Sequence, residues 1–384
     1  MTQHLKSDFL LDPEVIFLNH GSFGACPLPV FEAFQDWQRK LERRPVEFLG
    51  RQSISLMEEA RSALAEYMNC HADEVVYFPN PTTAINMVAR SLELKPYDEV
   101  LTTDHEYGAM DRTWRYVCHK ANARYVQQSI PLPVTSAEAF LDTFWAGVTE
   151  HTRIIFISHI TSPTALRFPV EAICRRAREA NIFCIVDGAH APGQIPLDLT
   201  KLGADLYTGA CHKWLCAPKG SAFLYARRDI QDLLEPLVIS WGWEAEKPGD
   251  SRFIDHHEWQ GTRDPAAFLS VPTAIEYQRV HNWASIRQDC HQLARITRDR
   301  INTLTGLSPI CPDTTDWYVQ MFAAHLPEVD VEELKQRLYD EFNIEVSVHR
   351  WNDQPFIRGS FQAYNNSKDA DALVQALSSL LPQV

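Results

Sequence analysis

Short apolar runs alternate with stretches of helical periodicity between about residues 55 and 235. TTAINMVARSLEL and ICRRAREAN place apolar residues at the spacing of an amphipathic helix. The runs that fit buried strands, rich in Val, Ile and Phe, are EVVYFPN, EVLTTDHE, RIIFISHI, NIFCIVDGAH, ADLYTGACH and GSAFLYAR. This alternation predicts an α/β fold in which helices cross over between the strands of a mostly parallel sheet.

The pattern changes beyond residue 265 to long amphipathic helices with fewer strands, which is typical of a smaller α+β domain. The segment GWEAEKPGDSRFIDHHEWQG is rich in Gly, Pro and mixed charge and is predicted to be the connecting loop. We therefore expect an N-terminal segment over residues 1–20, a large domain over 21–260 and a small C-terminal domain over 261–384.

Composition narrows the function classes. The 384 residues are 45% apolar and 22% charged, as in an ordinary globular enzyme. A formal net charge of −14 without a basic run argues against a nucleic-acid partner. No apolar stretch is long enough to cross a membrane, and the first residues lack the apolar centre of a secretory signal, so we expect a cytoplasmic protein.

The segment TGACHKWLCAPKG, residues 208–220, concentrates thiol, imidazole and amine groups. The nine cysteines of the chain include no CxxC pair and have no framework-like spacing, which favours reduced thiols. Four zinc ligands cannot be assembled from Cys211, His212, Cys216 and their neighbours, so we expect no metal. Lysine chemistry is the remaining alternative for this segment.

Two residues that follow strands suggest which cofactor the lysine serves. Asp187 ends the strand NIFCIVD and Lys213 follows the strand ADLYTGA, so both are expected at the edge of the sheet where ligands bind. Pyridoxal phosphate needs a carboxylate that keeps its ring nitrogen protonated and a lysine that forms an imine. Alternatively, Asp187 caps a helix, and Lys219 in the APKG turn is the other available amine.

A phosphate-bearing cofactor also needs donors for its phosphate and a surface for its ring. Thr82 and Thr83 are predicted at a helix N-terminus, where free amides and the helix dipole favour an anion. His105, which follows the strand EVLTTD, is expected to lie flat on the cofactor ring, with Tyr107 as the other aromatic candidate.

Several of these segments also carry a family resemblance. PTTAIN, DHEYGAM, VDGAHAPG, GACHKWLCAPKG, EWQGTRDP and FIRGSFQAYNN occur in an order that resembles the class V aminotransferase family of fold-type I pyridoxal-phosphate enzymes. The resemblance runs from FLNHGSFGACP to the end of the chain and is greatest to the isopenicillin N epimerase group. It implies a large domain with a mostly parallel seven-stranded sheet and a smaller α+β C-terminal domain.

The resemblance also implies roles for the residues at the cofactor. Lys213 matches the Schiff-base lysine and Asp187 the partner of the ring nitrogen. His105 matches the ring-stacking position and His190 the donor to the ring hydroxyl. The residues that match phosphate-binding positions are Thr82, Thr83, His212 and Thr262.

Two further implications concern the partner chain and the substrate. Thr262 matches a threonine that reaches the phosphate of the neighbouring chain, which implies a homodimer with shared active sites. Arg358 matches the arginine that binds the α-carboxylate of an amino acid, a role that suits the guanidinium fork. Asn19 and His20 lie where relatives shape the substrate entrance, near which we also expect Tyr107.

The residues do not by themselves select one reaction. Lys213 is the base in racemisation, transamination and β-elimination alike. Segment 342–358 lacks the nucleophilic cysteine that a persulfide-forming desulfurase needs. We expect an epimerase or racemase acting at the α-carbon of an amino acid or of an amino-acid-containing peptide. The alternatives are a C–S lyase that acts on cysteine conjugates or sulfoxides, an aminotransferase, and a non-catalytic cofactor-binding domain.

Overall fold

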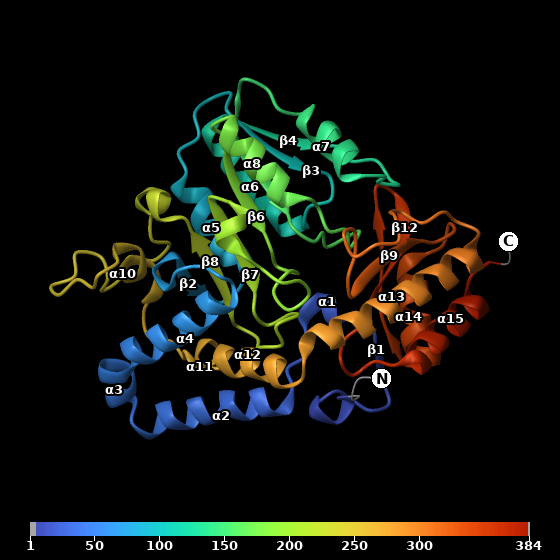
Figure 1. Ribbon diagram of the computed structural model, residues 1–384, viewed down its shortest axis with the longest axis horizontal. Helices are drawn as coiled ribbons and strands as arrows, with labels where there is room; N and C mark the ends of the chain where they lie inside the picture. The colour runs from blue at the N-terminus through green and yellow to red at the C-terminus, as the bar shows by residue number, and fades with distance from the viewer. Residues whose placement is uncertain (1–4, 383–384) are drawn as a thin grey trace.

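The computed structural model describes residues 5–382, which form two bodies of unequal size (Figure 1). The larger body is built on a seven-stranded sheet of order β2-β8-β7-β6-β5-β3-β4. Its strands are β2 (Val75–Phe78), β3 (Glu99–Thr103), β4 (Arg124–Gln128), β5 (Thr152–Ser158), β6 (Phe183–Asp187), β7 (Leu206–Ala210) and β8 (Ala222–Ala226). All neighbours are parallel except those that involve β8, so the prediction of a mostly parallel sheet is confirmed.

Helices cover both faces of this sheet, which is why its central strands β6 and β7 are buried along nearly their whole length. One face packs against α5 (Pro81–Ser91), α6 (Gly108–Ala121) and α10 (Arg252–Glu258). The other face packs against α4 (Ser53–Tyr67), α7 (Ala137–Trp145), α8 (Val170–Glu179) and α9 (Leu199–Leu202). The parallel strands therefore end at one edge of a layered body, where their following turns are free to form a site.

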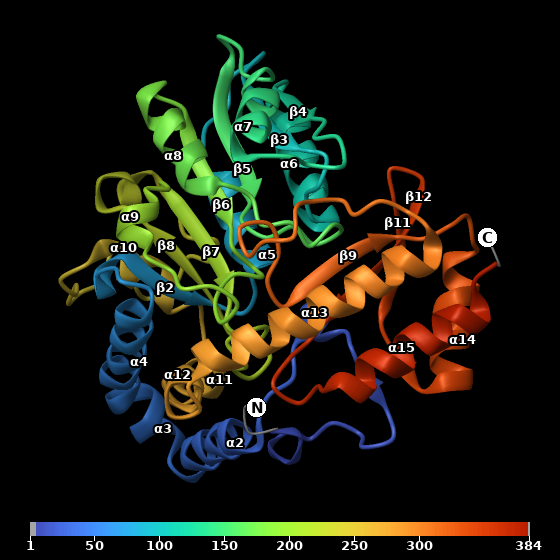
Figure 2. The same ribbon diagram turned by 45° about the vertical axis from the view of Figure 1, so that its right-hand side comes forward.

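The smaller body holds an antiparallel sheet of order β11-β12-β9 and three helices. Its elements are β9 (Met321–His325), β11 (Ser347–Trp351), β12 (Gln354–Ser360), α13 (Trp283–Thr305), α14 (Val331–Phe342) and α15 (Ser367–Leu380). Helix α13 runs from the large body into the small one (Figure 2). The N-terminal strand β1 (Ile16–Phe17) pairs with β10 (Ile344–Glu345), which ties the start of the chain to the small body.

Some helices beyond residue 260 pack with the large body. The helices α11 (Ala266–Leu269) and α12 (Val271–Val280) contact α2 (Leu28–Arg43) and α4, whereas a boundary at 260 assigns them to the C-terminal domain. Two short helices, α1 (His20–Phe23) and α3 (Pro45–Glu47), complete the N-terminal part. Within residues 5–382, no helix combines the length and the apolar character that crossing a membrane requires.

Candidate active site

A cavity of about 150 Å³ lies at the carboxyl ends of β5, β6 and β7. Side chains from several strand ends line it, together with the start of α5 and the short helix α1. The lining residues are Ser22, Phe23, Asn80, Pro81, Thr82, Tyr107, Met110, Ser158, Ile160, Ser162, Asp187, Ala189, His190, His212 and Lys213. The fold thus brings Thr82, Asp187, His190, His212 and Lys213 together at one cavity.

Lys213 presents a reactive amine to this cavity. Burial and the positive charge of Arg358 lower the pKa of Lys213 from the ordinary 10.5 to about 8, and Asp187 opposes the shift. A positive charge is costly to bury, and a second positive charge nearby adds to that cost. At this pKa roughly a tenth of Lys213 is unprotonated at pH 7, far more than for an ordinary lysine, and the unprotonated amine is the nucleophilic and basic form.

Asp187 lies on the floor of the cavity at the end of β6. Its Oδ1 accepts a hydrogen bond of 2.9 Å from the Ala189 amide, and Oδ2 has no partner among residues 5–382. Burial raises the pKa of Asp187, while the Ala189 amide and the positive charge of Lys213 oppose that rise. The free carboxylate oxygen is suited to a positively charged N–H donor, such as a protonated pyridine ring.

The tautomer of His190 follows from its neighbours. The indole N–H of Trp214 lies 3.2 Å from Nδ1 of His190, and an indole nitrogen can only donate, so Nδ1 accepts. Nε2 therefore carries the proton of the neutral ring and points to Lys213 Nζ at 3.2 Å. Burial and the charge of Lys213 lower the pKa of His190, which keeps the ring neutral. His190 can thus donate one hydrogen bond into the cavity.

His20 is placed behind Lys213, outside the cavity lining. Its Nε2 lies 3.0 Å from the Lys213 carbonyl oxygen and its Nδ1 lies 3.0 Å from the Tyr364 hydroxyl. Burial lowers the pKa of His20 to about 3, so the ring is neutral at physiological pH. Gly24, at φ +70°, passes so close that a Cβ would lie 2.1 Å from the His212 carbonyl. The N-terminal segment therefore supports the backbone of the lysine turn.

The first turn of α5 forms one end of the cavity. Asn80 caps the helix, because its Oδ1 accepts hydrogen bonds from the Thr83 amide at 2.8 Å and from Thr83 Oγ1 at 3.0 Å. Pro81 has no amide proton and the Thr83 amide is bound to Asn80, so among the described residues the Thr82 amide is the free donor of this turn. Thr82 lines the cavity, whereas Thr83 is turned to its cap. This end of the cavity suits an anion such as a phosphate.

His212 lies beside this anion-binding end and lines the same cavity. Its Nδ1 donates to the Ser221 carbonyl oxygen at 2.9 Å, and Nε2 has no partner within residues 5–382. Burial and the charges of Lys213 and Lys219 lower the pKa of His212 to about 4. A phosphate next to Nε2 would raise that pKa, because an anion favours the protonated ring.

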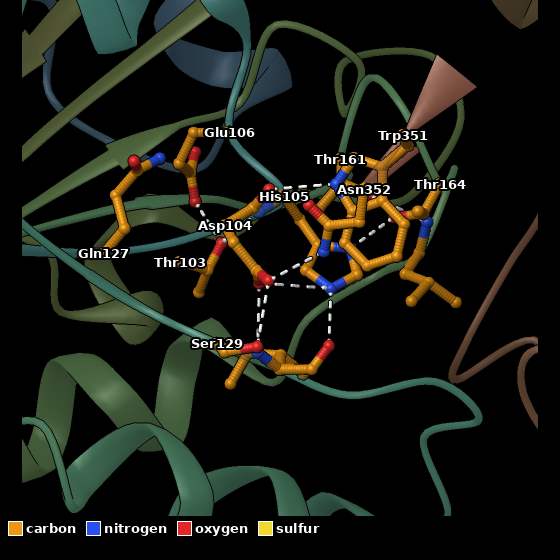
Figure 3. Close-up of polar contacts among 12 residues, drawn as sticks. Thr103, Asp104, His105, Glu106, Gln127, Ser129, Thr161, Thr164, Trp351 and Asn352 are labelled. Atoms are coloured by element: carbon orange, nitrogen blue, oxygen red, sulfur yellow. Dashed lines mark hydrogen bonds and ion pairs between the residues drawn. The ribbon is translucent and has the colours of Figure 1, made fainter. Parts of the chain in front are cut away.

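The structure places His105 outside the cavity, with both ring nitrogens held by the protein. Nδ1 lies 2.7 Å from Thr164 Oγ1 and Nε2 lies 2.9 Å from the Ile130 carbonyl oxygen. Trp351 covers the ring at a centroid distance of 4.2 Å (Figure 3). Tyr107, two residues later, lines the cavity in its place. Contacts with Thr164, the Ile130 carbonyl and Trp351 therefore keep His105 out of the cavity that Tyr107 lines.

Glu106 was not among the predicted residues, although it lies between the two aromatic candidates. Its carboxylate accepts a hydrogen bond from Thr103 Oγ1 at 2.7 Å (Figure 3). It also accepts hydrogen bonds from Ser158 Oγ at 2.5 Å and from the Ser158 amide at 3.3 Å. Burial raises the pKa of Glu106 to about 7, because the effect of burial is larger than the opposite effect of the hydrogen bonds from Ser158 and Thr103. Glu106 thereby fixes Ser158, which lines the cavity and pairs with Asp187 across β5 and β6.

Arg358 lies at a second hollow of about 280 Å³, which shares Tyr107 and Ser162 with the cavity. Its Nη1 donates to the Ser162 carbonyl oxygen at 2.6 Å and to Ser162 Oγ at 3.1 Å. Its Nη2 donates to Ser22 Oγ at 3.0 Å. Burial lowers the pKa of Arg358 to about 10, so the guanidinium stays charged at neutral pH. A buried, charged guanidinium held by serine hydroxyls is suited to a carboxylate ligand.

Two predicted site residues lie away from both hollows. Asn19 donates to Glu345 at 3.1 Å and accepts from Ser22 Oγ at 2.7 Å, so it acts on the Arg358 surroundings through Ser22. Thr262 is an exposed residue of the loop that follows α10. It does not line the cavity of its own chain.

Several residues of the site carry no clear sequence signal. Ser22 and Ser162 hold Arg358, but an isolated serine in a loop is commonplace. Asn80 did have a signal, because Asn before Pro is a favoured start of a helix. The thiols of Cys211 and Cys216 are fully buried and line neither hollow, and burial raises their pKa.

The arrangement fits pyridoxal phosphate. An anion-binding helix start, a buried carboxylate with a free oxygen and a lysine of lowered pKa face one cavity from different strand ends. These three groups match the phosphate, the ring nitrogen and the aldehyde of the cofactor.

Comparisons with known proteins support this reading. The family model "Aminotransferase class-V" matches residues 25–373. The isopenicillin N epimerase of Amycolatopsis lactamdurans is 34% identical, with 96% of each chain covered. A probable chloroplastic L-cysteine desulfhydrase of Arabidopsis thaliana is 28% identical over 96% of this chain and 84% of the relative.

The solved structures agree on the fold. A cysteine desulfurase from Thermococcus onnurineus NA1 superposes with a TM-score of 0.85 at 19% identity, covering 98% of this chain and 97% of the other. The family match spans both bodies and contains every cavity-lining group except the two from α1. The chain therefore belongs to the class V aminotransferase family and is a fold-type I, pyridoxal-phosphate-dependent enzyme.

Proposed function

We propose that the enzyme inverts the α-carbon of an amino acid, or of a peptide that carries a free amino-acid unit, in the manner of an isopenicillin N epimerase. The observation that supports a reaction at the α-carbon is Lys213, a buried amine of lowered pKa that lines the cavity with Asp187 beside the hollow of Arg358. The 34% identity to an epimerase over nearly the whole chain favours inversion over the other fates of the α-carbon.

The bound cofactor supplies a sink for the electron pair that is left when the α-C–H bond breaks. We assign Lys213 as the residue that holds the cofactor and takes the α-proton. Asp187 would keep the ring nitrogen protonated, and His190 Nε2–H would donate to the ring hydroxyl. Thr82 and His212 would bind the phosphate, with Thr83 fixing the helix start.

Arg358 would hold the substrate α-carboxylate, since its guanidinium is the positively charged group at the hollow beside Lys213. Tyr107 would replace His105 as the ring that covers the cofactor, because Tyr107 lines the cavity, whereas His105 does not and Trp351 covers its ring. The carboxylate would be oriented by charge-assisted hydrogen bonds, and this fixes which bonds of the α-carbon face the lysine.

A C–S lyase is the second candidate, because a desulfhydrase is 28% identical over most of both chains. Persulfide chemistry has less support, since no cysteine lines either hollow among the described residues. Proton NMR in D2O of the cofactor-loaded protein with isopenicillin N and with both enantiomers of free amino acids, cysteine included, separates the candidates. Loss of the α-proton signal with inversion supports the epimerase, whereas release of pyruvate or sulfide would make it a lyase.

We also propose a homodimer in which Thr262 reaches the phosphate in the partner's site. An exposed apolar surface near this loop supports the proposal, with Trp241 86% and Ile54 81% exposed. These two residues, with Arg263 and Pro265, line a hollow of about 600 Å³. The segment around α10 projects from the large body (Figure 1). A measured solution mass of one chain, or unchanged cofactor affinity in Thr262→Ala, would contradict the shared site.

A further inference from the structure

Inversion of a carbon centre requires that a proton be removed from one face and delivered to the opposite face, and Lys213 serves one of these faces. The order of the sheet defines the opposite side. β7, which leads to Lys213, is separated from β3, which leads to Tyr107, by β6 and β5. Three strand intervals correspond to about 14 Å. Asp187 and Ser158 end the two intervening strands, so a ring above them would lie between Lys213 and Tyr107.

Tyr107 is held in place by its backbone while its hydroxyl is free. The Tyr107 carbonyl accepts the Met110 amide at 2.8 Å at the start of α6. Its side chain is 49% exposed and lines both the cavity and the Arg358 hollow. The hydroxyl has no hydrogen-bond partner among residues 5–382. A phenol carries its proton at neutral pH and is able to donate it.

The other proton-carrying groups on this side are already engaged. His349 Nε2 lies 3.0 Å from the Pro163 carbonyl oxygen, and its Nδ1 lies 3.4 Å from Ser347 Oγ. The Glu106 carboxylate receives hydrogen bonds from Thr103 and Ser158. His105 is enclosed by Thr164, Ile130 and Trp351.

Resting on the proposed epimerase function, we infer that Tyr107 is the second catalytic acid and base, acting on the α-carbon from the face opposite Lys213. In one direction Lys213 Nζ would take the proton as the α-C–H bond breaks, and the bound cofactor would supply the sink for the electron pair. The O–H bond of Tyr107 then breaks as a new C–H bond forms on the other face. Lys213 afterwards returns its proton to solvent and Tyr107 regains one, so no oxidant or reductant is consumed.

The test compares Tyr107→Phe, which keeps the ring and removes the hydroxyl, with Tyr116→Phe. Tyr116 is a half-exposed tyrosine of α6 that lies outside both hollows. The probes are the two epimers of isopenicillin N in D2O, followed by α-deuteration and by chiral analysis. Cofactor affinity and the absorption spectrum without substrate provide a second readout for each variant.

Tyr107→Phe is expected to slow inversion by about 10² to 10⁴-fold, the usual contribution of a general acid or base. It should still exchange the α-proton of one epimer with retention, because that proton faces Lys213, and should not exchange the other epimer. Cofactor binding and spectrum should stay close to those of the wild type, and Tyr116→Phe should invert normally.

Inversion by Tyr107→Phe at the wild-type rate would overturn the inference, as would loss of exchange from both epimers. Glu106→Gln provides a second variant: if it loses inversion while Tyr107→Phe retains it, the donor is Glu106. A wild-type enzyme that inverts no probe would instead refute the proposed function itself, and the inference with it.

Discussion

The two walls of the cavity differ in how firmly the protein holds them. The Lys213 wall is buried and braced from distant parts of the chain: His20 contacts the Lys213 carbonyl at 3.0 Å, and Gln278 donates to the Trp214 carbonyl at 2.9 Å. The Tyr107 wall is half-exposed, and its hydroxyl has no partner among the described residues. Chemistry common to the whole family needs a fixed lysine, whereas the choice of reaction depends on the wall that is left open to the substrate.

The largest effect is expected from substitution of Lys213, on the buried side of the cavity. Lys213→Ala should abolish the absorbance of the covalent cofactor link and lower turnover by about 10³-fold or more, because both the attachment point and the base are lost. Absorption spectroscopy and turnover of the purified variant measure this. Lys219→Ala is the matched control, since Lys219 Nζ donates to the Gly24 carbonyl at 2.9 Å and does not line the cavity. A retained spectrum in Lys213→Ala would assign the link to another amine.

A smaller effect is expected at the hollow that Tyr107 shares with Arg358. Arg358→Ala should raise the KM for the substrate about 10- to 100-fold, because a charge-assisted hydrogen bond to a carboxylate contributes roughly 1.5–3 kcal/mol. Arg358→Lys should recover part of this loss, since it keeps the charge without the planar fork. Steady-state kinetics of both variants test the assignment. An unchanged KM in Arg358→Ala would mean that another group binds the carboxylate.

The smallest expected effect is a shift in the pH dependence of cofactor attachment to Lys213, caused by the charge of Arg358. Only unprotonated Lys213 attacks the cofactor aldehyde, so formation of the covalent link by apoprotein should rise with pH around a midpoint near 8, the lowered pKa of Lys213. Arg358→Gln removes a positive charge that helps to lower this pKa, and the midpoint should therefore move upward. Stopped-flow absorbance over a range of about four pH units, from roughly pH 6 to pH 10, measures the midpoint of the wild type and that of the variant. A midpoint near 10.5 in the wild type would contradict the effect of burial.

Part of the site was predictable because parallel strands end at one edge of a sheet. Asp187 ends one buried strand and Lys213 follows another, and the fold brings both to one cavity. The sequence predicts Thr82 and Thr83 at the start of a helix. In the structure Thr83 Oγ1 donates a hydrogen bond to Asn80 Oδ1, and Thr82 lines the cavity. A strand-end rule specifies which turns meet, and it does not specify where each side chain of a turn points.

The sequence by itself determined the layered α/β body, the mostly parallel sheet, the lysine and carboxylate at its edge, and the family. These depend on short-range apolar periodicity and on residues fixed at strand ends. Only the tertiary structure decided that Tyr107 lines the cavity and His105 does not, because Trp351 and the Ile130 carbonyl, both remote in the chain, enclose His105. It likewise decided that His20 braces the lysine turn, since a contact across so many residues leaves no periodic trace in the sequence.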